Sequence, residues 1–593
     1  MFSISSATAA PSNSRPLWAE DQAPAFVGSA PGTTWTTVEA GRTRLAVAGS
    51  CFAGKEELHH GLAAIRAGRW RELTQWPGSY WAIADDGHST AVLTDVAGTR
   101  PVYLATYKSR TEWSTSATAL AQAAHSELDY QTLTARMVCP TVPEVCGDGT
   151  AFHGVRRLPA GHALLVDREG RSRTVAYETM PGPVSSFYQA ADELRTALTQ
   201  AVAARARSAG HVTADFSGGL DSTSLALLAC AEGIPVHAVT HADPTSSNDD
   251  LSYALRAATA CPELRHELVE DPDGLFFEDV MAAPHTDQPF PDAARWRMRD
   301  AYQSRCVGSD AHLTGSGADT LLSVPPYYLA DLARQRRTGE LWRHCLARAR
   351  LRHLPVHAVV AAAVRLSCTG LPDALRQMAA ELRRPAPAAL SRGARLHWCM
   401  PSGLAAWLTP PARLELADRA LRAAENCHLS RADTSRWRTW SELGEFGTYE
   451  AELRNQAHGL GVAHQAPYLD NAVVRAAMSV PVACRASLHV QKPLLGAALD
   501  GLVPSWLLGR RTKGSYDGNA YTGLHRNAEV VRELIQHGRL AQEGWIEPGL
   551  ALSAFERMAA GVPDRFMALE ALVTTELWLH QLHQTQEVAC ARA

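Results

Sequence analysis

The sequence predicts an α/β protein with a β-rich N-terminal domain and a C-terminal domain that holds a parallel sheet and added helices. Two stretches near the N-terminus, 44–49 and 78–84, have the apolar and aromatic composition of strands. Beyond residue 210, apolar strands alternate with helical patterns, which is typical of βα units and of a parallel sheet. Residues 325–440 are rich in Arg, Ala and Leu and are mostly helical in pattern.

The bulk composition limits the class of protein. The hydrophobic fraction of 46% and the charged fraction of 20% are those of a globular protein, and 593 residues leave room for two or more domains. The net charge of −4 argues against a nucleic-acid partner. The N-terminus lacks the pattern of a secretion signal, and no apolar run is long enough to cross a bilayer. We therefore expect a cytoplasmic protein without a membrane partner.

Two residue types carry further information. The twelve cysteines show neither CxxC spacing nor the pattern of a zinc site, so we expect them to be reduced. Only four of the 57 basic residues are lysines, namely Lys55, Lys108, Lys492 and Lys513. Because arginine is the usual cation in this chain, each lysine is a candidate for a position that needs a compact ammonium group.

The domain boundary is predicted at a linker with two prolines and a glycine, Met180–Val184. The two domains therefore span residues 1–184 and 185–593. The second domain is expected to begin with an amphipathic helix over Phe187–Ala206, which leads into the first strand of the parallel sheet.

In the first domain the periodicity predicts strands at 44–49, 78–84 and 91–94 and helices at 56–67 and 117–124. Residues 1 to about 180 are therefore expected to be rich in β-structure.

Three of its segments resemble the N-terminal glutaminase domain of asparagine synthetases. Gly78–Ile83 and Leu93–Tyr103 are similar to strands of that domain, and Gly154–His162 is similar to the hairpin that closes it. The resemblance implies a class II amidotransferase-type fold with αββα layers.

The N-terminal residue departs from that family. An active glutaminase of this type uses a cysteine exposed by Met removal, whose free α-amine acts as the base. Position 2 is Phe2, and the first cysteine is Cys51. We therefore expect a retained domain that does not produce ammonia from glutamine.

The most informative stretch lies in the second domain and reads SGGLDS from Ser217 to Ser222. A strand-like run, His211–Phe216, precedes this tight turn, and a helical run, Ser224–Ala231, follows it. The start of a helix offers unpaired N–H groups and partial positive charge, so a strand, a glycine turn and a helix together can bind an anion.

Within this turn, Gly218 and Gly219 allow the backbone to close on a phosphate, and Asp221 supplies a carboxylate for a phosphate-bound Mg²⁺. No Walker A sequence occurs in the chain. The turn resembles the PP-loop of the ATP pyrophosphatases, which implies ATP and Mg²⁺ as cofactors and Ser217 and Ser222 as further nucleotide ligands. The alternative is an ordinary βα turn.

Two neighbouring segments extend the predicted nucleotide site. Ile234–Thr240 reads as the next parallel strand, and the adjacent helix, 251–260, is expected to be capped by Asn248–Asp250. Ligands of such sheets bind at the carboxyl ends of the strands, which is where Thr240 lies.

A second acidic turn follows a third strand-like run, His312–Thr314. Gly315, Ser316 and Gly317 form a turn that delivers Asp319, which could share one Mg²⁺ with Asp221, and Gly315 is a further candidate for contact with the nucleotide. The alternative is an ordinary loop without a metal ligand, because a Gly-Ser-Gly-Ala-Asp sequence by itself is common in such loops.

After a PP-loop, the same turn resembles the second acidic motif of asparagine synthetases and β-lactam synthetases. The position between the glycines holds glutamate in the former and tyrosine in the latter, and is Ser316 here. The residue after the aspartate is Thr320, where asparagine synthetases usually have glutamate. The nucleotide chemistry is thus expected to be kept and the handling of the amine to be changed, with Ser316 as a catalytic candidate.

Tryptophans and prolines gather between Trp398 and Pro411. Such a cluster suits either a packed core or a groove for an extended peptide, and the sequence leaves both open. An asparagine synthetase has less chain in this region, so the added helices predict a substrate larger than an amino acid.

The C-terminal region carries the last resemblance. Ala466–Asp470 is similar to the Val-Pro-Phe-Leu-Asp region of the synthetases, and the segments that begin at Lys492 and Arg510 follow the family's C-terminal pattern. In that pattern Lys492 and Lys513 occupy the two lysine positions, and the second lysine stabilises the developing negative charge. The alternative for each is a surface lysine.

These features together are similar to those of lasso peptide cyclases, which are relatives of asparagine and β-lactam synthetases. The resemblance implies ATP-dependent adenylation of an Asp or Glu side chain of a precursor core peptide, followed by attack of the peptide's N-terminal amine. It also implies a leader peptidase and a leader-binding protein as partners.

Three other functions remain open from the sequence. They are a β-lactam-synthetase-like cyclase of a small molecule, an ammonia-dependent asparagine synthetase and a non-catalytic nucleotide-binding scaffold. The general base is also open among His458, His464, Glu450 and the adenylate phosphate.

Overall fold

The computed structural model describes most of the chain, namely residues 4–6, 14–18, 25–27, 35–180, 186–242, 249–384, 396–512, 514 and 517–592. Phe2, the linker after Met180, Asn248 and Lys513 lie outside these residues. The predicted domain boundary at 184/185 falls in the same undescribed linker and stays a prediction.

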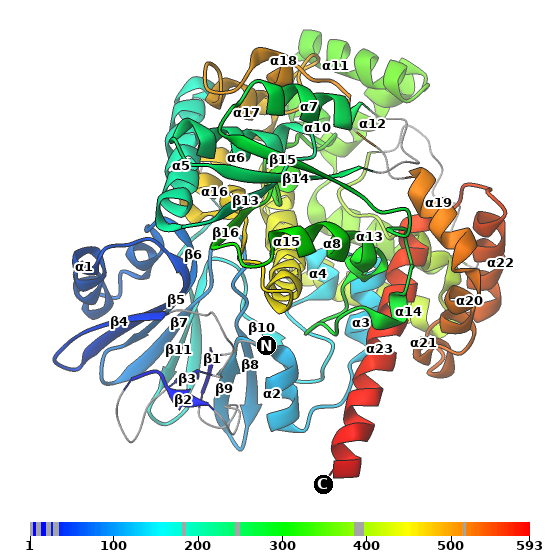
Figure 1. Cartoon of the computed structure of the whole chain (residues 1–593). Helices are drawn as coiled ribbons and strands as arrows, with labels where there is room; N and C mark the ends of the chain where they lie inside the picture. Colours follow the sequence, from blue (N-terminus) through cyan, green and yellow to red (C-terminus); the bar gives the residue numbers. More distant parts are fainter. Residues whose placement is uncertain are drawn as a thin grey trace.

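Two antiparallel sheets form the N-terminal domain (Figure 1). In spatial order, the first consists of β12 (Ser172–Ala176), β11 (His162–Asp167), β7 (Ser89–Leu93), β6 (Gly78–Asp85), β5 (Thr43–Cys51) and β4 (Trp35–Ala40). The second consists of β10 (Arg156–Arg157), β8 (Tyr103–Tyr107), β9 (Arg110–Ser114), β1 (Ile4–Ser5), β3 (Phe26–Val27) and β2 (Arg15–Pro16).

Alternating side chains build the layers of this domain. Ala46 and Leu104 face each other's sheets in a core between the two. The next residues along these strands, Val47 and Tyr103, point the other way, Val47 toward α1 (Lys55–Arg66). On the far side, α2 (Ala117–Ala124) packs against β8. Since successive strand residues point to opposite faces, the result is the expected αββα arrangement.

One expectation about this domain is wrong. The segment Gly154–His162 is not a hairpin, because β10 pairs with β8 in one sheet whereas β11 pairs with β7 and β12 in the other. The turn at Pro159–Gly161 carries the chain from one sheet to the other, and the hairpin is formed by β11 and β12.

The C-terminal domain contains a five-stranded sheet that is parallel throughout. In spatial order its strands are β15 (Leu264–Glu270), β14 (Val236–Ala242), β13 (Val212–Asp215), β16 (Ala311–Leu313) and β17 (His464–Gln465). The strand order changes direction between β13 and β16, and ligands of such sheets bind at the carboxyl end of this point. In Figure 1 the sheet lies in the upper half, above the β-rich domain.

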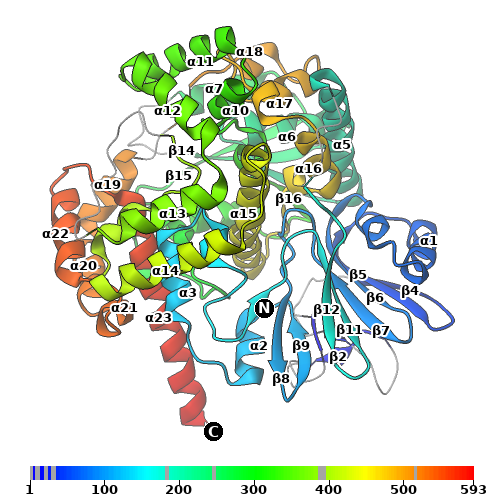
Figure 2. The ribbon, with the colours of Figure 1, turned by 180° about the vertical axis from the view of Figure 1, so that it is seen from behind.

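Helices surround the parallel sheet and extend away from it. The helices along the first half of the domain are α5 (Phe187–Ser208), α6 (Leu220–Ala231), α7 (Asp250–Thr259), α8 (Trp296–Gln303), α9 (Ala318–Leu322), α10 (Tyr328–Arg334), α11 (Thr338–Leu351), α12 (Val356–Cys368) and α13 (Leu371–Leu382). Those in the second half are α14 (Pro410–Asn426), α15 (Thr434–Gly459), α16 (Asn471–Met478), α17 (Pro493–Ala498), α18 (Ser505–Leu508), α19 (Asp517–Arg526), α20 (Ala528–Gln536), α21 (Arg539–Gln542), α22 (Pro548–Ala559) and α23 (Phe566–Arg592). Figure 2 shows α19 to α23 grouped at one side of the molecule. The added helices expected between 325 and 440 are thus present in the described residues.

Two short helices of the first domain, α3 (Tyr130–Val138) and α4 (Pro143–Cys146), pack against α14 of the second. Among the described helices, none by itself has the length and apolar composition to cross a membrane; α12 and α13 reach it only as a pair, bent by 116°.

A buried ion pair of the second domain lies close to the parallel sheet and contacts the first domain. Arg205 of α5 donates to both oxygens of Asp470 at 2.8 and 2.6 Å, and both side chains are almost fully buried. The same carboxylate accepts from the backbone N–H of Gly78 in β6 at 3.1 Å. Asn471 extends this contact by accepting from the backbone N–H of Val96 at 2.8 Å.

Candidate active site

The PP-loop lies between β13 and α6, at the carboxyl edge of the sheet. Gly218 has a φ of 75°, and a Cβ there would overlap the carbonyl oxygen of Asp250, so the position requires glycine. Helix α6 begins at Leu220, four residues earlier than the sequence suggested. Asp221 and Ser222 therefore belong to the first helical turn, where the N-terminal end of α6 favours negative charge.

The two serines of the loop fix its shape. The hydroxyl oxygens of Ser217 and Ser222 are 3.0 Å apart, and Ser217 Oγ accepts from the backbone N–H of Gly219 at 3.2 Å. These bonds hold the turn in a conformation in which the start of α6 and the glycine backbone face the same edge of the sheet.

Lys492 brings the two predicted acidic residues together. Its ammonium lies 2.6 and 2.5 Å from the oxygens of Asp221 and 2.8 Å from an oxygen of Asp319. The lysine side chain is buried, whereas Asp221 and Asp319 are 23% and 57% exposed. The cluster carries two negative charges and one positive charge, and its open side is the acidic one.

The second glycine turn approaches the PP-loop closely. A Cβ at Gly315 would lie 2.8 Å from the backbone nitrogen of Ser222, and one at Gly317 would overlap Leu469. Gly317 also has a φ of 84°. The glycines thus allow the two turns to touch, which places Asp319, in the first turn of α9, beside Asp221.

The donor set fits Mg²⁺ that is shared with a nucleotide. Asp221 and Asp319 offer the hard oxygen ligands that Mg²⁺ prefers. The described residues hold no group of three or more His, Cys, Asp or Glu side chains suited to a metal ion. The remaining ligands would therefore be phosphate oxygens and water, which is the usual way in which Mg²⁺ binds with nucleotides. Bound there, Mg²⁺ would neutralise charge on the pyrophosphate.

Ser316 belongs to a buried polar cluster beside this site. Its hydroxyl donates to one oxygen of Glu450, and the other oxygen of Glu450 lies 2.6 Å from Nε2 of His464. Burial raises the pKa of Glu450, but His464, Ser316 and Arg454 outweigh it and hold that pKa below the ordinary value. Glu450 is thus in direct contact with Ser316, and His464 is linked to Ser316 through Glu450. His458 lies about two turns further along α15.

Thr240 lies at the carboxyl edge of the sheet, but its hydroxyl forms hydrogen bonds within the protein. It donates to the carbonyl oxygen of Phe216, the residue before the PP-loop, and lies 2.7 Å from Nε2 of His266. Burial lowers the pKa of His266. The side chain of Thr240 therefore holds the start of the loop in place, while its assignment as a direct nucleotide ligand stays a prediction.

Beneath the site, a second polar pair joins the central strands. His312 of β16 is fully buried, with Nε2 3.1 Å from Asp215 and Nδ1 2.9 Å from Thr213 of β13. Burial lowers the pKa of His312, but the charge of Asp215 outweighs it and raises the pKa to about 10. The pair fixes the relative position of the strands that carry both turns.

Sequence reasoning missed the role of Arg510. Its guanidinium donates to the carbonyl oxygen of Gly218 at 2.8 Å and to Asp249 at 2.6 Å, and it also pairs with Asp250. It lies over the ring of Tyr253 at 4.3 Å. One buried arginine therefore ties the PP-loop to α7, and the only signal in the sequence was its place three residues before Lys513.

The expected cap of α7 is partly wrong for the same reason. Asp249 makes no side-chain bond to the helix start but accepts from Arg510 and from the hydroxyl of Thr512 at 2.7 Å. Gln491 holds the neighbouring carbonyl of Arg511 at 2.8 Å. These bonds fix the chain up to the residue before Lys513.

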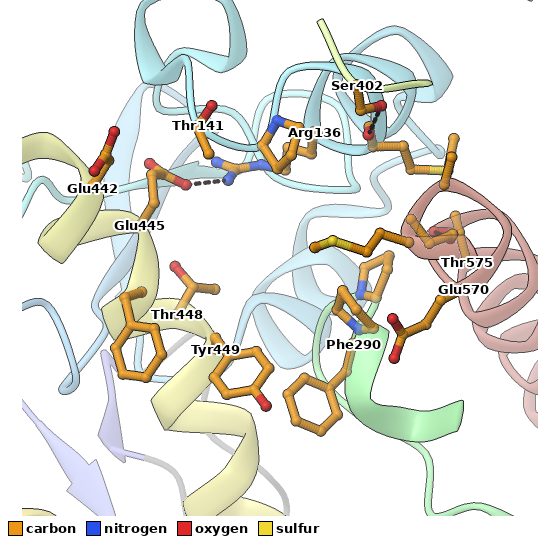
Figure 3. A pocket seen from close by; sticks show the side chains of 18 of the residues that line it. Arg136, Thr141, Phe290, Ser402, Glu442, Glu445, Thr448, Tyr449, Glu570 and Thr575 are labelled. Carbon is orange, nitrogen blue, oxygen red and sulfur yellow. Dashed lines mark hydrogen bonds and ion pairs between the residues drawn. The ribbon is translucent and has the colours of Figure 1, made fainter. Parts of the chain in front are cut away.

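A cavity of about 1840 Å³ opens at α9 and runs away from the two aspartates. Asp319, Thr320 and Ser323 line its near end, and its walls come from α3, α15, α19 and α23. Figure 3 shows Glu442, Glu445, Thr448 and Tyr449 of α15 on one side of it and Glu570 of α23 on the other. The cavity therefore joins the nucleotide site to a chamber between the two domains.

The two tryptophans of the Trp398–Pro411 segment that the structure places are core residues, whereas a groove for an extended peptide stays a prediction. Trp398 and Trp407 are core residues, 3% and 2% exposed, and Trp398 donates to the carbonyl of Thr369 at 2.8 Å. The residues between them, Met400–Gly403, line the cavity.

A family model described as asparagine synthase matches residues 193–580, which include both glycine turns and Lys492. No curated protein matches the chain. Among solved structures, the chain is similar to an allosteric regulatory enzyme of purine biosynthesis, with 12% identity, a TM-score of 0.16 and coverage of 39% of this chain and 61% of that one. It is also similar to the glutamine phosphoribosylpyrophosphate amidotransferase from B. subtilis complexed with ADP and GMP, with 12% identity, a TM-score of 0.17 and coverage of 53% and 64%. The chain spans about three fifths of each of these proteins, and at such TM-scores the likeness has no bearing on fold or function.

Proposed function

Since this chain belongs to the asparagine synthase family of ATP-dependent, amide-forming ligases, we propose that it closes a macrolactam ring in a ribosomal peptide. In the first step, an Asp or Glu side-chain carboxylate of the peptide attacks the α-phosphorus of ATP, and pyrophosphate leaves. In the second, the N-terminal amine of the same peptide attacks the acyl carbon. The bond from that carbon to AMP breaks and the amine loses one proton. This is the reaction of a lasso peptide cyclase.

The size and position of the cavity carry this proposal. Pockets for small ligands are typically about 300–1000 Å³, whereas this cavity has about 1840 Å³ and begins at Asp319. A free amino acid would leave most of it unfilled. A peptide, in contrast, can place one carboxylate at the nucleotide site and the rest of its chain in the cavity.

Each residue of the site has a separate task in this reaction. The PP-loop backbone and the start of α6 bind phosphate oxygens. Asp221 and Asp319 would hold Mg²⁺, and Lys492 balances their charge and stabilises the leaving pyrophosphate. Lys513, outside the described residues, is proposed to stabilise the oxyanion that forms when the amine attacks.

In the polar cluster at Ser316, Glu450 is the group that we propose accepts the proton of the attacking amine. A carboxylate is a proton acceptor, and Glu450 is held by two donors, Ser316 and His464, at the wall shared with the nucleotide site. The adenylate phosphate is the alternative acceptor.

The experiment is incubation of the protein with ATP, Mg²⁺ and candidate precursor core peptides, followed by mass spectrometry. Ring closure is seen as the loss of one water from the peptide, together with release of AMP and pyrophosphate. The control is the same incubation with Asp221→Asn. Formation of asparagine from free aspartate and ammonium, with no dehydrated peptide, would instead identify an ammonia-dependent asparagine synthetase.

A leader peptidase and a leader-binding protein are proposed as partners on the strength of the resemblance alone. Co-purification of the protein with each candidate, before and after addition of the full-length precursor, tests whether they form a stable complex.

A further inference from the structure

The turn Asp95–Arg100 of the first domain is buried in the core of the second. Val96 and Ala97 are 1% and 0% exposed and belong to the cluster of apolar side chains around the parallel sheet. The segment that carries this turn, Leu93–Tyr103, resembles part of a glutaminase, yet position 2 is Phe2 rather than the nucleophilic cysteine of such enzymes. The place of the turn suggests a function other than glutamine hydrolysis.

We propose that this turn is a positioning element for the amine-transfer step: it holds helix α15 through Gly447 and Arg454, so that Glu450 stays fixed beside Ser316. The inference rests on the proposed function, in which Glu450 accepts the proton of the amine, and adds to it a role for the first domain.

The turn contacts α15 where this helix carries two glycines. A Cβ at Gly447 would lie 2.1 Å from the carbonyl oxygen of Ala97, so the helix and the turn can touch only because this residue is glycine. Arg157 of the first domain donates to the carbonyl oxygens of Gly98 and Gly444, at 2.9 and 3.0 Å. The turn therefore lies directly on α15, one helical turn before the proposed proton acceptor.

A second contact lies one helical turn after Glu450. Arg454 donates from Nη2 to the carbonyl oxygen of Thr99 at 2.7 Å. Residues four apart lie on the same face of a helix, so the guanidinium is a neighbour of the Glu450 carboxylate. Burial raises the pKa of this carboxyl, but its two hydrogen-bonding partners and then Arg454 outweigh burial and lower the pKa. One side chain thereby joins the first domain to the charge of the site.

Hydrogen bonds of Asp95 make the turn a fixed support. Its carboxylate accepts from the hydroxyl of Thr99 and, at 3.0 Å, from the backbone N–H of Arg100. Its carbonyl oxygen accepts from the backbone N–H groups of Gly98 and Gly161, at 3.2 and 3.1 Å. Because these bonds fix the turn internally, the carbonyl of Thr99 is presented to α15 in a defined position.

A shift of α15 would affect one half-reaction more than the other. Proton transfer requires hydrogen-bond distance, and a displacement of about 1 Å can lower a rate about a hundredfold. The nucleotide site is built on other elements, namely the PP-loop, α6 and α9. Loss of the contact between the turn and α15 should therefore impair attack by the amine and leave adenylation largely intact. This difference separates a positioning role from general support of the fold.

The test compares two substitutions on α15 and measures both half-reactions. Gly447→Ala places a methyl group against the carbonyl of Ala97, and Arg454→Gln removes the guanidinium that binds Thr99. Adenylation is measured as peptide-dependent exchange of labelled pyrophosphate into ATP, and ring closure as loss of one water from the core peptide that wild type cyclises. Gly459→Ala is the matched control, because this exposed glycine ends the same helix and an added Cβ would have no atom within 4 Å.

We expect Gly447→Ala and Arg454→Gln to slow ring closure about tenfold or more, while pyrophosphate exchange stays close to that of wild type. Arg454→Lys, which keeps the charge beside Glu450, should retain more ring closure than Arg454→Gln. Gly459→Ala should behave as wild type in both measurements.

Two results would overturn the inference. Ring closure at the wild-type rate in either variant would mean that the amine-transfer step does not depend on the turn, and an equal loss of both half-reactions would mean that the turn only supports the fold. If wild type cyclises no peptide but converts free aspartate and ammonium to asparagine, the proposed function is wrong. The same variants are then compared on asparagine formation, which also needs attack by an amine and tests the inference in the same way. If wild type forms no amide from either substrate, the proposed function and this inference both fail.

Discussion

Lys492 shows how much one residue depends on its surroundings. In the sequence it is one of four lysines on a recognisable pattern, whereas in the structure it is a buried ammonium in contact with two aspartates. An arginine in its place would be longer and planar, and the small gap between Asp221 and Asp319 suits a compact charge. The residue scale is therefore where the chemistry of the nucleotide site can be tested most directly.

Asp221→Asn is expected to abolish adenylation. The substitution removes a metal carboxylate and leaves Lys492 with one charged partner, which should raise the barrier by at least about 3 kcal/mol, on the order of a hundredfold in rate. Peptide-dependent exchange of labelled pyrophosphate into ATP measures this step. Asp192→Asn, an exposed position on α5, is the control. Exchange at the wild-type rate in Asp221→Asn would exclude this residue from the metal site.

Glu452 should make stability depend on pH. The pKa of this carboxyl is about 8 in the folded chain and roughly 4.3 in an unfolded one. The folded state therefore keeps a proton that the unfolded state releases, so the stabilisation is complete below about pH 4.3 and is lost as the pH rises through about 8.

In that window, wild type should lose about 1.4 kcal/mol per pH unit relative to Glu452→Gln, which has no proton to lose. Urea unfolding of both proteins at several pH values gives the difference. A constant difference between pH 5 and pH 8 would show that Glu452 titrates normally.

At the scale of elements, loops that are far apart in the sequence are fixed by direct contacts with one another. The PP-loop, the start of α7 and the segment before Lys513 meet at one guanidinium, that of Arg510. The two glycine turns touch because Gly315 has no side chain. The nucleotide site is thus a property of several turns in fixed contact.

Arg510→Lys should weaken ATP binding although it keeps the charge. A lysine has one nitrogen and cannot reach Gly218, Asp249 and Asp250 together, so the PP-loop loses its tie to α7. We expect the KM for ATP to rise about tenfold, equivalent to ~1.4 kcal/mol. The matched control is Arg511→Lys, whose side chain is exposed. Equal KM values for Arg510→Lys and wild type would contradict the role of this contact.

At the scale of the whole molecule, the two domains form a common wall. The cavity takes residues from α3 of the first domain and from α15 and α23 of the second. The Arg205–Asp470 pair lies at the junction and also holds β6 through Gly78. The N-terminal domain therefore forms part of the wall of this cavity.

Arg205→Met is expected to destabilise the protein strongly. Removal of one partner leaves the charge of Asp470 buried without its cation, which typically costs about 3–5 kcal/mol. Arg207→Met breaks an exposed pair with Glu232 and should cost less than about 1 kcal/mol. Melting temperatures of the two variants compare them directly. A similar small shift in both would mean that the buried pair contributes no more to stability than the exposed one.

The features that the sequence by itself determined are local ones. Strands such as β6, helices such as α1 and α2, and the strand–turn–helix unit at Ser217–Ser222 follow from periodicity and from glycine, because neighbours along the chain largely set backbone conformation. The sequence also predicted that Asp221 and Asp319 lie close together. Each follows a strand of the parallel sheet, and these strands end at the same edge of the sheet.

Only the tertiary structure decided the rest. Nothing local in Gly154–His162 shows that β10 and β11 belong to different sheets, since strand partners are chosen by the packing of two whole faces. Helix α15 carries polar residues around its circumference, so its sequence did not reveal that Glu450 faces Ser316 while Glu452 faces the cavity. The contact between Glu450 and Ser316 joins residues 134 positions apart, and those of β10 and β11 join residues more than fifty positions apart. They exist because burial removes water from charged groups, which must then find a partner elsewhere in the fold.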